Sequence, residues 1–200
     1  MKKLVIHPNN PQSRLIEHAV NTLKQDQLII YPSDIGYEFA LTLQSKMALQ
    51  QLQHINQKHE HLTLLCRNLS EVASYATINN AQHRLLKKHT PSSFGFIVDA
   101  NKALPKKFVH SKSKAITIKV SDNPITQALL ACLDAPLLSY PLTLPNHHNV
   151  YEVGHIDDVF GKHVGALIDV GELAAHTTTI IDITNAEAAV VQQGTLEWIN

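Results

Sequence analysis

Residues 29–43 read IIYPSDIGYEFALTL, and this stretch decides the fold. A hydrophobic run stops at Pro32 and resumes after Gly36, now with an apolar side chain at every second residue. A short apolar run is typical of a buried strand, and strict alternation is typical of a half-buried one. Pro32 removes a ladder donor, and Gly36 permits a turn that other residues resist. The stretch therefore predicts two strands, the first ending at Pro32, joined by a polar turn that carries Ser33 and Asp34.

This polar turn has two interpretations. Polar groups on loops at strand ends are where α/β folds commonly bind ligands. Alternatively, the turn is a plain hairpin in which Asp34 accepts hydrogen bonds from backbone N–H groups. Residue chemistry by itself favours the plain hairpin, and the ligand-binding turn is the alternative.

Outside this stretch, strands and helices interleave along the chain. Apolar spacing and capping residues predict helices at residues 15–23, 46–55, 69–75, 79–88, 123–133 and 155–165. Alternating or continuous apolar runs predict strands at residues 4–6, 62–66, 94–98, 115–120, 136–142, 166–170, 177–183 and 188–193. Because several strands follow one another directly, we expect an α/β fold with a twisted, mixed sheet and flanking helices. No linker interrupts the pattern, so residues 1–200 are expected to form a single domain.

Composition excludes several classes of protein. A hydrophobic fraction of 44% in 200 residues predicts a globular core rather than disorder. Cys66 and Cys132 stand alone, so they indicate neither a disulfide scaffold nor a zinc ribbon. The histidines lack the spacing of metal ligands, so no metal site is predicted. No apolar run has the length of a signal peptide or of a membrane span, which predicts a soluble cytoplasmic protein with no membrane partner.

Charge is balanced overall but uneven along the chain. The formal net charge is zero, yet the region between Arg84 and Lys119 is rich in lysine and has Asp99 as its one acid. Within it lies what we call the lysine segment, which consists of Lys102, Lys106, Lys107, Lys112 and Lys114. A local positive field attracts phosphates, although a solvated loop would look the same. Phe108 is the only Phe, Trp or Tyr between Lys102 and Lys119, so stacking on single strands is disfavoured, and structured RNA read by shape is the compatible partner.

Five motifs resemble, in order, those of the YrdC-like family, and its YciO-like branch in particular. They are YPSDIGY at 31–37, ITIKVSDNPITQALL at 116–130, PLLSYPLTLP at 136–145, TTTIIDIT at 177–184 and AAVVQQG at 188–194. The resemblance covers nearly the whole chain and implies a YrdC-type fold with a concave, positively charged groove. Such synthases join L-threonine, bicarbonate and ATP into threonylcarbamoyl-adenylate, which serves the N6-threonylcarbamoyladenosine modification of transfer RNA. The implied cofactor is ATP with Mg²⁺, and the implied partners are ATP, L-threonine and transfer or double-stranded RNA.

The motifs also imply a set of site residues, some kept and some replaced. The expected substrate- or nucleotide-binding residues are Ser33, Asp34, Lys58, Lys119, Ser139, Thr143 and Thr178. Departures from the family pattern stand at Asn56, Gly95, Tyr140, Pro141, Thr143 and Gln192. No catalytic residue is assigned. Two hypotheses follow: an RNA- and nucleotide-binding protein with degenerate synthase motifs, or a divergent active nucleotidyltransferase. A monomer and a dimer would both fit.

Overall fold

The hairpin predicted from residues 29–43 is present in the computed structural model, which describes residues 1–56, 62–109, 113–144 and 150–199. Strands β2 (Ile29–Ser33) and β3 (Gly36–Thr42) pair antiparallel, with Ser33 opposite Gly36. The prediction that Pro32 ends the first strand is wrong, because Pro32 lies within β2 opposite Tyr37. The other neighbour of β2 pairs only as far as Ile30, so Pro32 sits where the strand has one partner, a position that tolerates proline.

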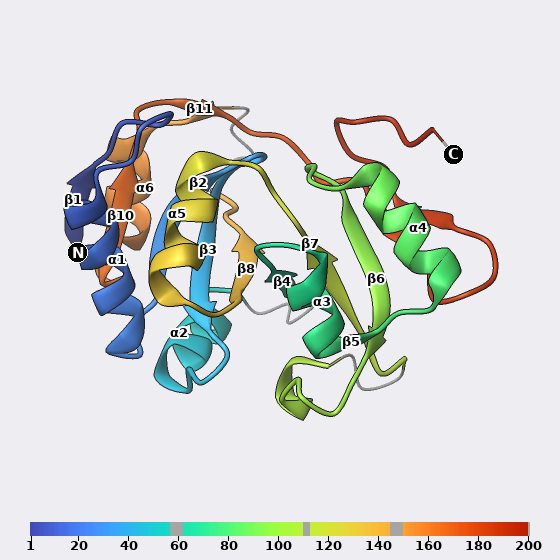
Figure 1. Ribbon diagram of the computed structural model, residues 1–200. Helices are drawn as coiled ribbons and strands as arrows, with labels where there is room; N and C mark the ends of the chain where they lie inside the picture. Colours follow the sequence, from blue (N-terminus) through green and yellow to red (C-terminus); the bar gives the residue numbers. More distant parts are fainter. Residues whose placement is uncertain (57–61, 110–112, 145–149, 200) are drawn as a thin grey trace.

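A single large, twisted sheet runs through the molecule (Figure 1). Its order is β1-β10-β2-β3-β8-β4-β7-β6-β12-β13, and β5 joins it by pairing with β6. The remaining strands of this sheet are β1 (Lys2–Val5), β4 (Thr63–Leu65), β5 (Ala76–Thr77), β6 (Gly95–Ala100), β7 (Ala115–Lys119), β8 (Leu137–Pro141), β10 (Ala166–Asp169), β12 (Ile180–Asp182) and β13 (Ala189–Gln192). Parallel pairs such as β1–β10 and β4–β7 occur together with antiparallel pairs such as β3–β8, which confirms the mixed α/β fold.

The six predicted helices are present, although the one predicted at residues 155–165 begins at Val153 and ends at Phe160. They are α1 (Ser13–Lys24), α2 (Met47–Ile55), α3 (Leu69–Tyr75), α4 (Asn80–His89), α5 (Pro124–Leu133) and α6 (Val153–Phe160). The cap predicted for α5 is also present, because Asn123 accepts hydrogen bonds from the N–H groups of Ile125 and Thr126. Short elements without a sequence signal were missed: β5, the paired strands β9 (Val150–Tyr151) and β11 (Leu173–Ala174), and a 3-10 turn at Lys106–Phe108. Among the described residues no helix is both long and apolar enough to span a membrane.

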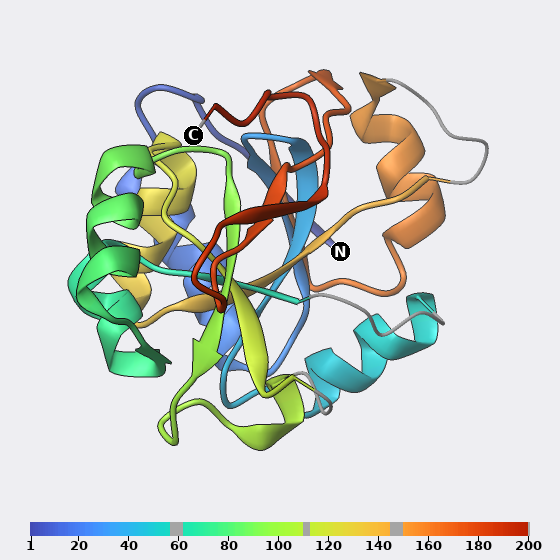
Figure 2. The same cartoon turned by 90° about the vertical axis from the view of Figure 1, so that its right-hand side faces the viewer.

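Two hydrophobic clusters hold the helices on the sheet. Helices α1 and α5 pack on each other and on β2, and bury side chains such as Val20 and Leu129. The other cluster lies beneath α2 and α6 and continues under α3 and α4, where the twist of the sheet has turned its face (Figure 2). Phe39 packs edge-on against Phe160 within it. The sheet therefore has helices on both faces, and polar side chains are exceptional between them.

Candidate functional site

A stripe of polar side chains crosses one face of this sheet. The strand register places Ser139 between Ala40 and Thr63, and places Thr63 beside Thr117. Glu38 and Lys119 lie two residues along their strands from members of this row, so they share its face. Side chains at such positions normally pack against the core. A continuous polar stripe in a buried sheet indicates a site rather than packing.

Lys119 forms an ion pair at the edge of this stripe. Its Nζ lies 3.0 Å from Oδ2 of Asp34, and the lysine side chain is only 4% exposed. The approach is not aligned for a hydrogen bond, so this buried oxygen of Asp34 receives charge compensation without a directed donor. The turn between β2 and β3 is thus a hairpin, but its carboxylate pairs with a distant lysine rather than with local backbone N–H groups.

Tyr31, Glu38 and Ser139 form a buried hydrogen-bonded group next to the pair. The Tyr31 hydroxyl donates to Oε2 of Glu38 at 3.3 Å and lies 3.0 Å from Oγ of Ser139. All three side chains are buried. Burial raises the pKa of Tyr31 well above its ordinary value, and the nearby charge of Glu38 adds to the shift. Tyr31 therefore stays protonated and acts as a fixed donor that orients the carboxylate.

A cavity of about 440 Å³ opens over this stripe. Its wall is formed by the β2–β3 turn, by strands β3, β4, β7, β8, β9, β12 and β13, and by the segments that follow β8 and lead into β12. The lining residues are Ile35, Glu38, Thr63, Lys119, Tyr140, Pro141, Leu142, Thr143, Leu144, Tyr151, Ala175, His176, Thr177, Thr178, Ile180 and Gln192. Most ligand pockets in proteins fall in a range of about 300–1,000 Å³. The cavity therefore has room for a small molecule the size of an amino acid or a nucleotide.

The described lining of the cavity is not strongly basic. It carries one lysine, Lys119, which is already paired with Asp34, and one carboxylate, Glu38. The groove predicted from the family resemblance is therefore present as a concavity, and its positive charge is not provided by the residues described on its wall. A ligand that fits this lining needs one group that pairs with the Glu38 carboxylate and another that pairs with the Lys119 ammonium.

The structure brings together most of the predicted binding residues. Thr143 and Thr178 line the cavity with Lys119, and Ser139 lies fully buried beneath it. Ser33 stays in the turn, where its Oγ accepts the N–H of Ile35 at 3.2 Å. Lys58 lies outside the described residues.

The lysine segment lies elsewhere. It connects the end of β6 to the start of β7, whereas Lys119 closes the far end of β7, roughly 13 Å away at about 3.3 Å per residue. Lys102, Lys106 and Lys114 are exposed there, and Lys112 lies outside the described residues. The Nζ of Lys107 instead donates to the carbonyl of Ser45 at 2.6 Å.

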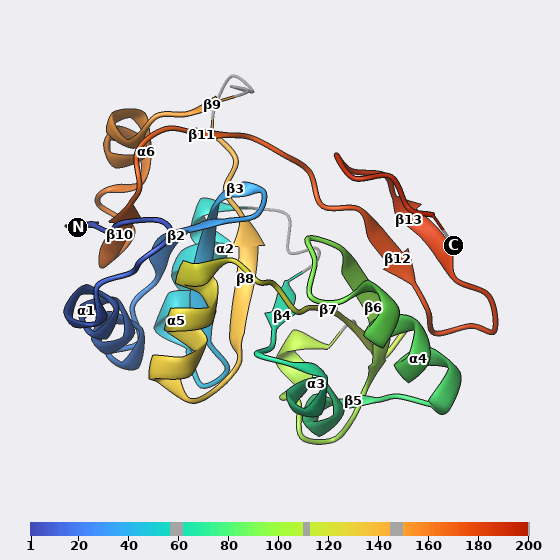
Figure 3. The same cartoon turned by 45° about the horizontal axis from the view of Figure 1, so that its top comes forward.

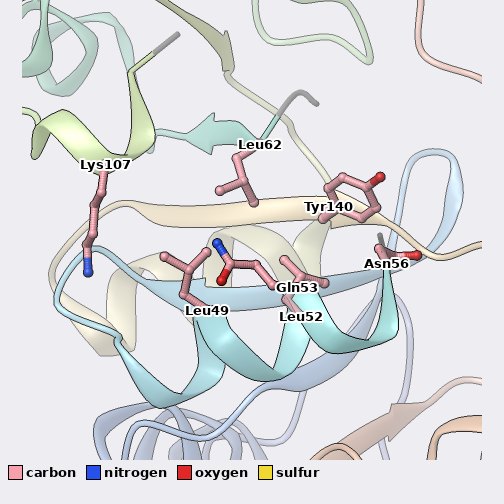
Figure 4. Close-up of a pocket in the computed structure, with 7 residues that line it drawn as sticks. All are labelled: Leu49, Leu52, Gln53, Asn56, Leu62, Lys107 and Tyr140. Atoms are coloured by element: carbon pink, nitrogen blue, oxygen red, sulfur yellow. The ribbon is translucent and has the colours of Figure 1, made fainter. Parts of the chain in front are cut away.

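Lys107 also borders a second, smaller hollow between α2 and β8. This pocket of about 70 Å³ is lined by Leu49, Leu52, Gln53, Asn56, Leu62, Lys107 and Tyr140. Figure 4 shows Lys107 and Tyr140 at its opposite ends, with the leucines between them. Tyr140 borders the large cavity too, so its ring stands between the two hollows. The small one holds only a few atoms.

Sequence reasoning missed Glu38, Thr63 and Thr117. Their strands read YEFALTL, LTLLC and AITIKV, and the apolar alternation predicted strands without marking a site. A signal was nevertheless available, because each strand carries a polar residue at a position that faces the same way as Ser139. Only the order of the strands in the sheet, which the sequence does not state, turns these separate residues into one stripe.

Comparison with known proteins identifies the family. The Sua5/YciO/YrdC family model, described as "Telomere recombination", matches residues 21–194. The protein YciO of Escherichia coli K12 is 38% identical over 192 residues, which cover 94% of this chain and 93% of YciO. A threonylcarbamoyl-AMP synthase of Vibrio vulnificus YJ016 is 21% identical over 164 residues, 78% of this chain and 88% of the synthase.

Two solved structures have the same fold as this chain. The crystal structure of E. coli YciO superposes with a TM-score of 0.91 at 37% identity and covers 98% of both chains. P. abyssi Sua5, crystallised with L-threonine, superposes with a TM-score of 0.85 at 14% identity, over 98% of this chain and 58% of Sua5. The fold is thus the one shared by YciO and Sua5. The chain belongs to the Sua5/YciO/YrdC family, and it is related to the threonylcarbamoyl-AMP synthases.

Proposed function

We propose that the cavity over the polar stripe binds a nucleotide, with ATP and its Mg²⁺ as the ligand, and that an amino acid such as L-threonine occupies the same cavity. The observation that carries this proposal is Lys119, a lysine that is 3% exposed and borders a cavity of about 440 Å³. A buried lysine is costly unless its charge is used or paired, and here it is held in place by Asp34. Lysine is a common point-charge partner for phosphate.

The donor set of the lining suits a metal-bound triphosphate better than a free one. Glu38 presents a carboxylate to the cavity, and the Tyr31 hydroxyl is its one hydrogen-bond donor among the described residues. A bare triphosphate would be repelled by this carboxylate. Mg²⁺ prefers oxygen ligands and reduces the negative charge of the phosphates, so Glu38 is the residue that would hold it. An ammonium group, as in L-threonine, would satisfy Glu38 in the same way.

The same residues favour binding over efficient synthesis. Where the family has a lysine–x–arginine pair, this chain has Asn56 and Lys58, and Lys119 replaces an arginine whose fork binds phosphate in two places. Joining carboxylated threonine to the α-phosphate demands several cations at once, because positioning and charge neutralisation supply nearly all the catalysis. We therefore propose a binding protein with degenerate synthase motifs, and keep the active synthase as the alternative outcome of the test.

One experiment tests both versions. The purified protein is incubated with ATP, Mg²⁺, L-threonine and labelled bicarbonate, with a threonylcarbamoyl-AMP synthase as the positive control. Binding of Mg²⁺–ATP and of L-threonine is measured in two separate titrations. We expect measurable ATP binding with no label transferred above the enzyme-free blank. Label in threonylcarbamoyl-adenylate would establish the active synthase instead. Absence of ATP and threonine binding would contradict the proposal in both forms.

RNA is a second candidate ligand, and a different surface favours it. Lys102, Lys106 and Lys114 are exposed on one loop, away from the cavity. Each phosphate that is neutralised releases a counterion, so the affinity for double-stranded RNA should fall steeply as salt is raised. Replacing Lys102 and Lys106 by alanine should remove about two phosphate contacts, so the plot of log affinity against log salt should become less steep by about two. ATP binding should stay unchanged. A slope that stays the same in this double variant, in filter-binding titrations across a salt series, would exclude the loop as the RNA surface.

A further inference from the structure

The chain after β13 turns back and runs beside residues 177–179, which lead into β12 (Figure 3). Thr195 donates its N–H to the carbonyl of Thr177 at 2.9 Å, and its hydroxyl accepts the N–H of Thr177 at 3.1 Å. Gly194 donates its N–H to the hydroxyl of Thr179 at 2.9 Å. These bonds tie the C-terminal segment to the 177–179 run from both ends.

Gly194 and Gln192 also hold the chain at the end of β13 against residues 177–179. A side chain on Gly194 would overlap backbone atoms of Thr177, Thr178 and Thr179, so only glycine allows this approach. The side-chain amide of Gln192 donates to the carbonyl of Thr178 at 2.9 Å. Thr177 and Thr179 are therefore held by the segment after β13, and Thr178 is held by the last residue of β13.

Trp198 anchors the end of this segment. Its ring centroid lies 4.3 Å from that of His89, 5.4 Å from that of Phe94 and 5.9 Å from that of Phe96. The two phenylalanines meet it edge-on, at 85° and 75°, the arrangement that aromatic pairs favour. The neighbouring apolar side chain of Ile199 is 75% exposed. Trp198 is thus the side chain through which the segment attaches to the hydrophobic cluster that lies beneath α2 and α6 and continues under α3 and α4.

The 177–179 run lies between this segment and the cavity. Thr177 and Thr178 line the cavity, as do Ile180 in β12 and Gln192 in β13. Thr179 is 1% exposed, and its carbonyl accepts the N–H of Gly95 at 3.0 Å. The segment therefore supports one wall of the cavity from behind.

We infer that residues 193–199 form a strap that fixes this wall, and that Trp198 is a positioning residue for the ligand of the cavity. The inference rests on the proposed function in one respect, namely that the cavity binds a ligand. Docking of the strap and binding of the ligand favour the same wall geometry. Their coupling must be reciprocal: the ligand tightens the strap by the factor by which the docked strap raises affinity.

The test uses the whole chain of 200 residues and its own reporter, because Trp198 is its single tryptophan. Hydrogen exchange of the Gly194, Thr195 and Thr177 amides is compared in wild type, Trp198→Ala and Trp198→Phe, and Mg²⁺–ATP affinity is measured by calorimetry. Ile199→Ala, an exposed neighbour, is the matched control. Loss of the aromatic contacts should speed exchange at these amides by about tenfold or more and weaken Mg²⁺–ATP binding by about fivefold or more. Trp198→Phe should keep most of the slow exchange and most of the Mg²⁺–ATP affinity of wild type.

The outcomes separate the inference from the proposed function. Slow exchange retained in Trp198→Ala would overturn the anchor, and faster exchange with unchanged Mg²⁺–ATP affinity would overturn the positioning role. Wild type provides a test that needs no variant: Mg²⁺–ATP should slow exchange at Gly194 and shift the emission of Trp198, and bound ATP without either change contradicts the coupling. If wild type binds no ATP, the proposed function fails, and the exchange rates of the unliganded variants still decide whether Trp198 anchors the wall.

Discussion

Replacing Lys119 by methionine should remove most of the affinity of the cavity for Mg²⁺–ATP and destabilise the fold. Lys119 is the one lysine on the described wall, and a charge-assisted hydrogen bond to a ligand contributes about 1.5–3 kcal/mol, so affinity should fall by about tenfold to a hundredfold. The substitution also strands the carboxylate of Asp34, whose side chain is 16% exposed. Breaking a buried pair costs about 3–5 kcal/mol, and the partial exposure of Asp34 places this case near the lower end.

A double variant separates the two effects. Asp34→Asn combined with Lys119→Met removes both charges, so no unpaired carboxylate remains and stability should return to within about 1 kcal/mol of wild type. Affinity for Mg²⁺–ATP should stay low in this variant. Lys119→Arg keeps the charge and supplies a planar guanidinium that can bind phosphate at two points, so it should bind Mg²⁺–ATP at least as well as wild type. Urea unfolding and ATP titration of wild type, Lys119→Met, the double variant and Lys119→Arg separate the effect on stability from the effect on binding. Unchanged ATP affinity in Lys119→Met would remove Lys119 from the site.

Local patterns predicted the elements because the information for them is local. The alternation in YEFALTL predicted the strand β3, and Asn123 followed by proline predicted the start of α5. The prediction that this strand is half-buried is wrong, because every residue of β3 is buried in the middle of the sheet. Pro32 is another exception: proline usually ends a paired strand, and here β2 continues because its other neighbour stops at Ile30. The error concerns strand order, which no local pattern states.

The site could be predicted only where a motif named its residues. Asp34 and Lys119 lie in two motifs far apart in the chain, and their pairing depends on where β7 ends relative to the β2–β3 turn. Glu38 carries no such mark, since one acid in an alternating strand looks like a solvent-facing residue, yet it is 4% exposed. Trp198 is similar, because nothing near the C-terminus indicates that its ring meets Phe94 and Phe96. Contacts between distant segments, rather than residue types, decided these roles.

The lysine segment and Lys119 belong to the same basic stretch of the sequence, and that stretch does not state whether they share a surface. Strand direction separates the two, because a loop that follows β6 lies at the other end of the β6–β7 pair from Lys119. Charge that is close in sequence is therefore split between two places, which is why nucleotide and RNA binding need separate tests.

Replacing Gly36 by alanine should be among the most destabilising single-methyl changes in the chain. Gly36 has a φ of +115°, a region that residues with a Cβ rarely adopt, and such strain costs about 1–3 kcal/mol. The added Cβ would also lie 2.5 Å from Cε2 and 2.7 Å from Cδ2 of the Tyr151 ring. That ring is held by a hydrogen bond from its hydroxyl to the carbonyl of Leu142 and by an edge-on contact with Tyr37, so it cannot simply swing away.

Two other glycines make the comparison quantitative. Gly171 has a φ of +91° with nothing within 4 Å of an added Cβ, so Gly171→Ala measures backbone strain alone, and Gly154 in α6 has open space and no such strain. We expect Gly154→Ala to be neutral or slightly stabilising, Gly171→Ala to cost about 1–2 kcal/mol, and Gly36→Ala to cost about 3 kcal/mol or more in urea unfolding. Because Tyr151 lines the cavity, Gly36→Ala should also weaken Mg²⁺–ATP binding, whereas Gly171→Ala should not. Equal costs for Gly36→Ala and Gly171→Ala would show that the Tyr151 ring yields freely, and that the turn does not fix this wall of the cavity.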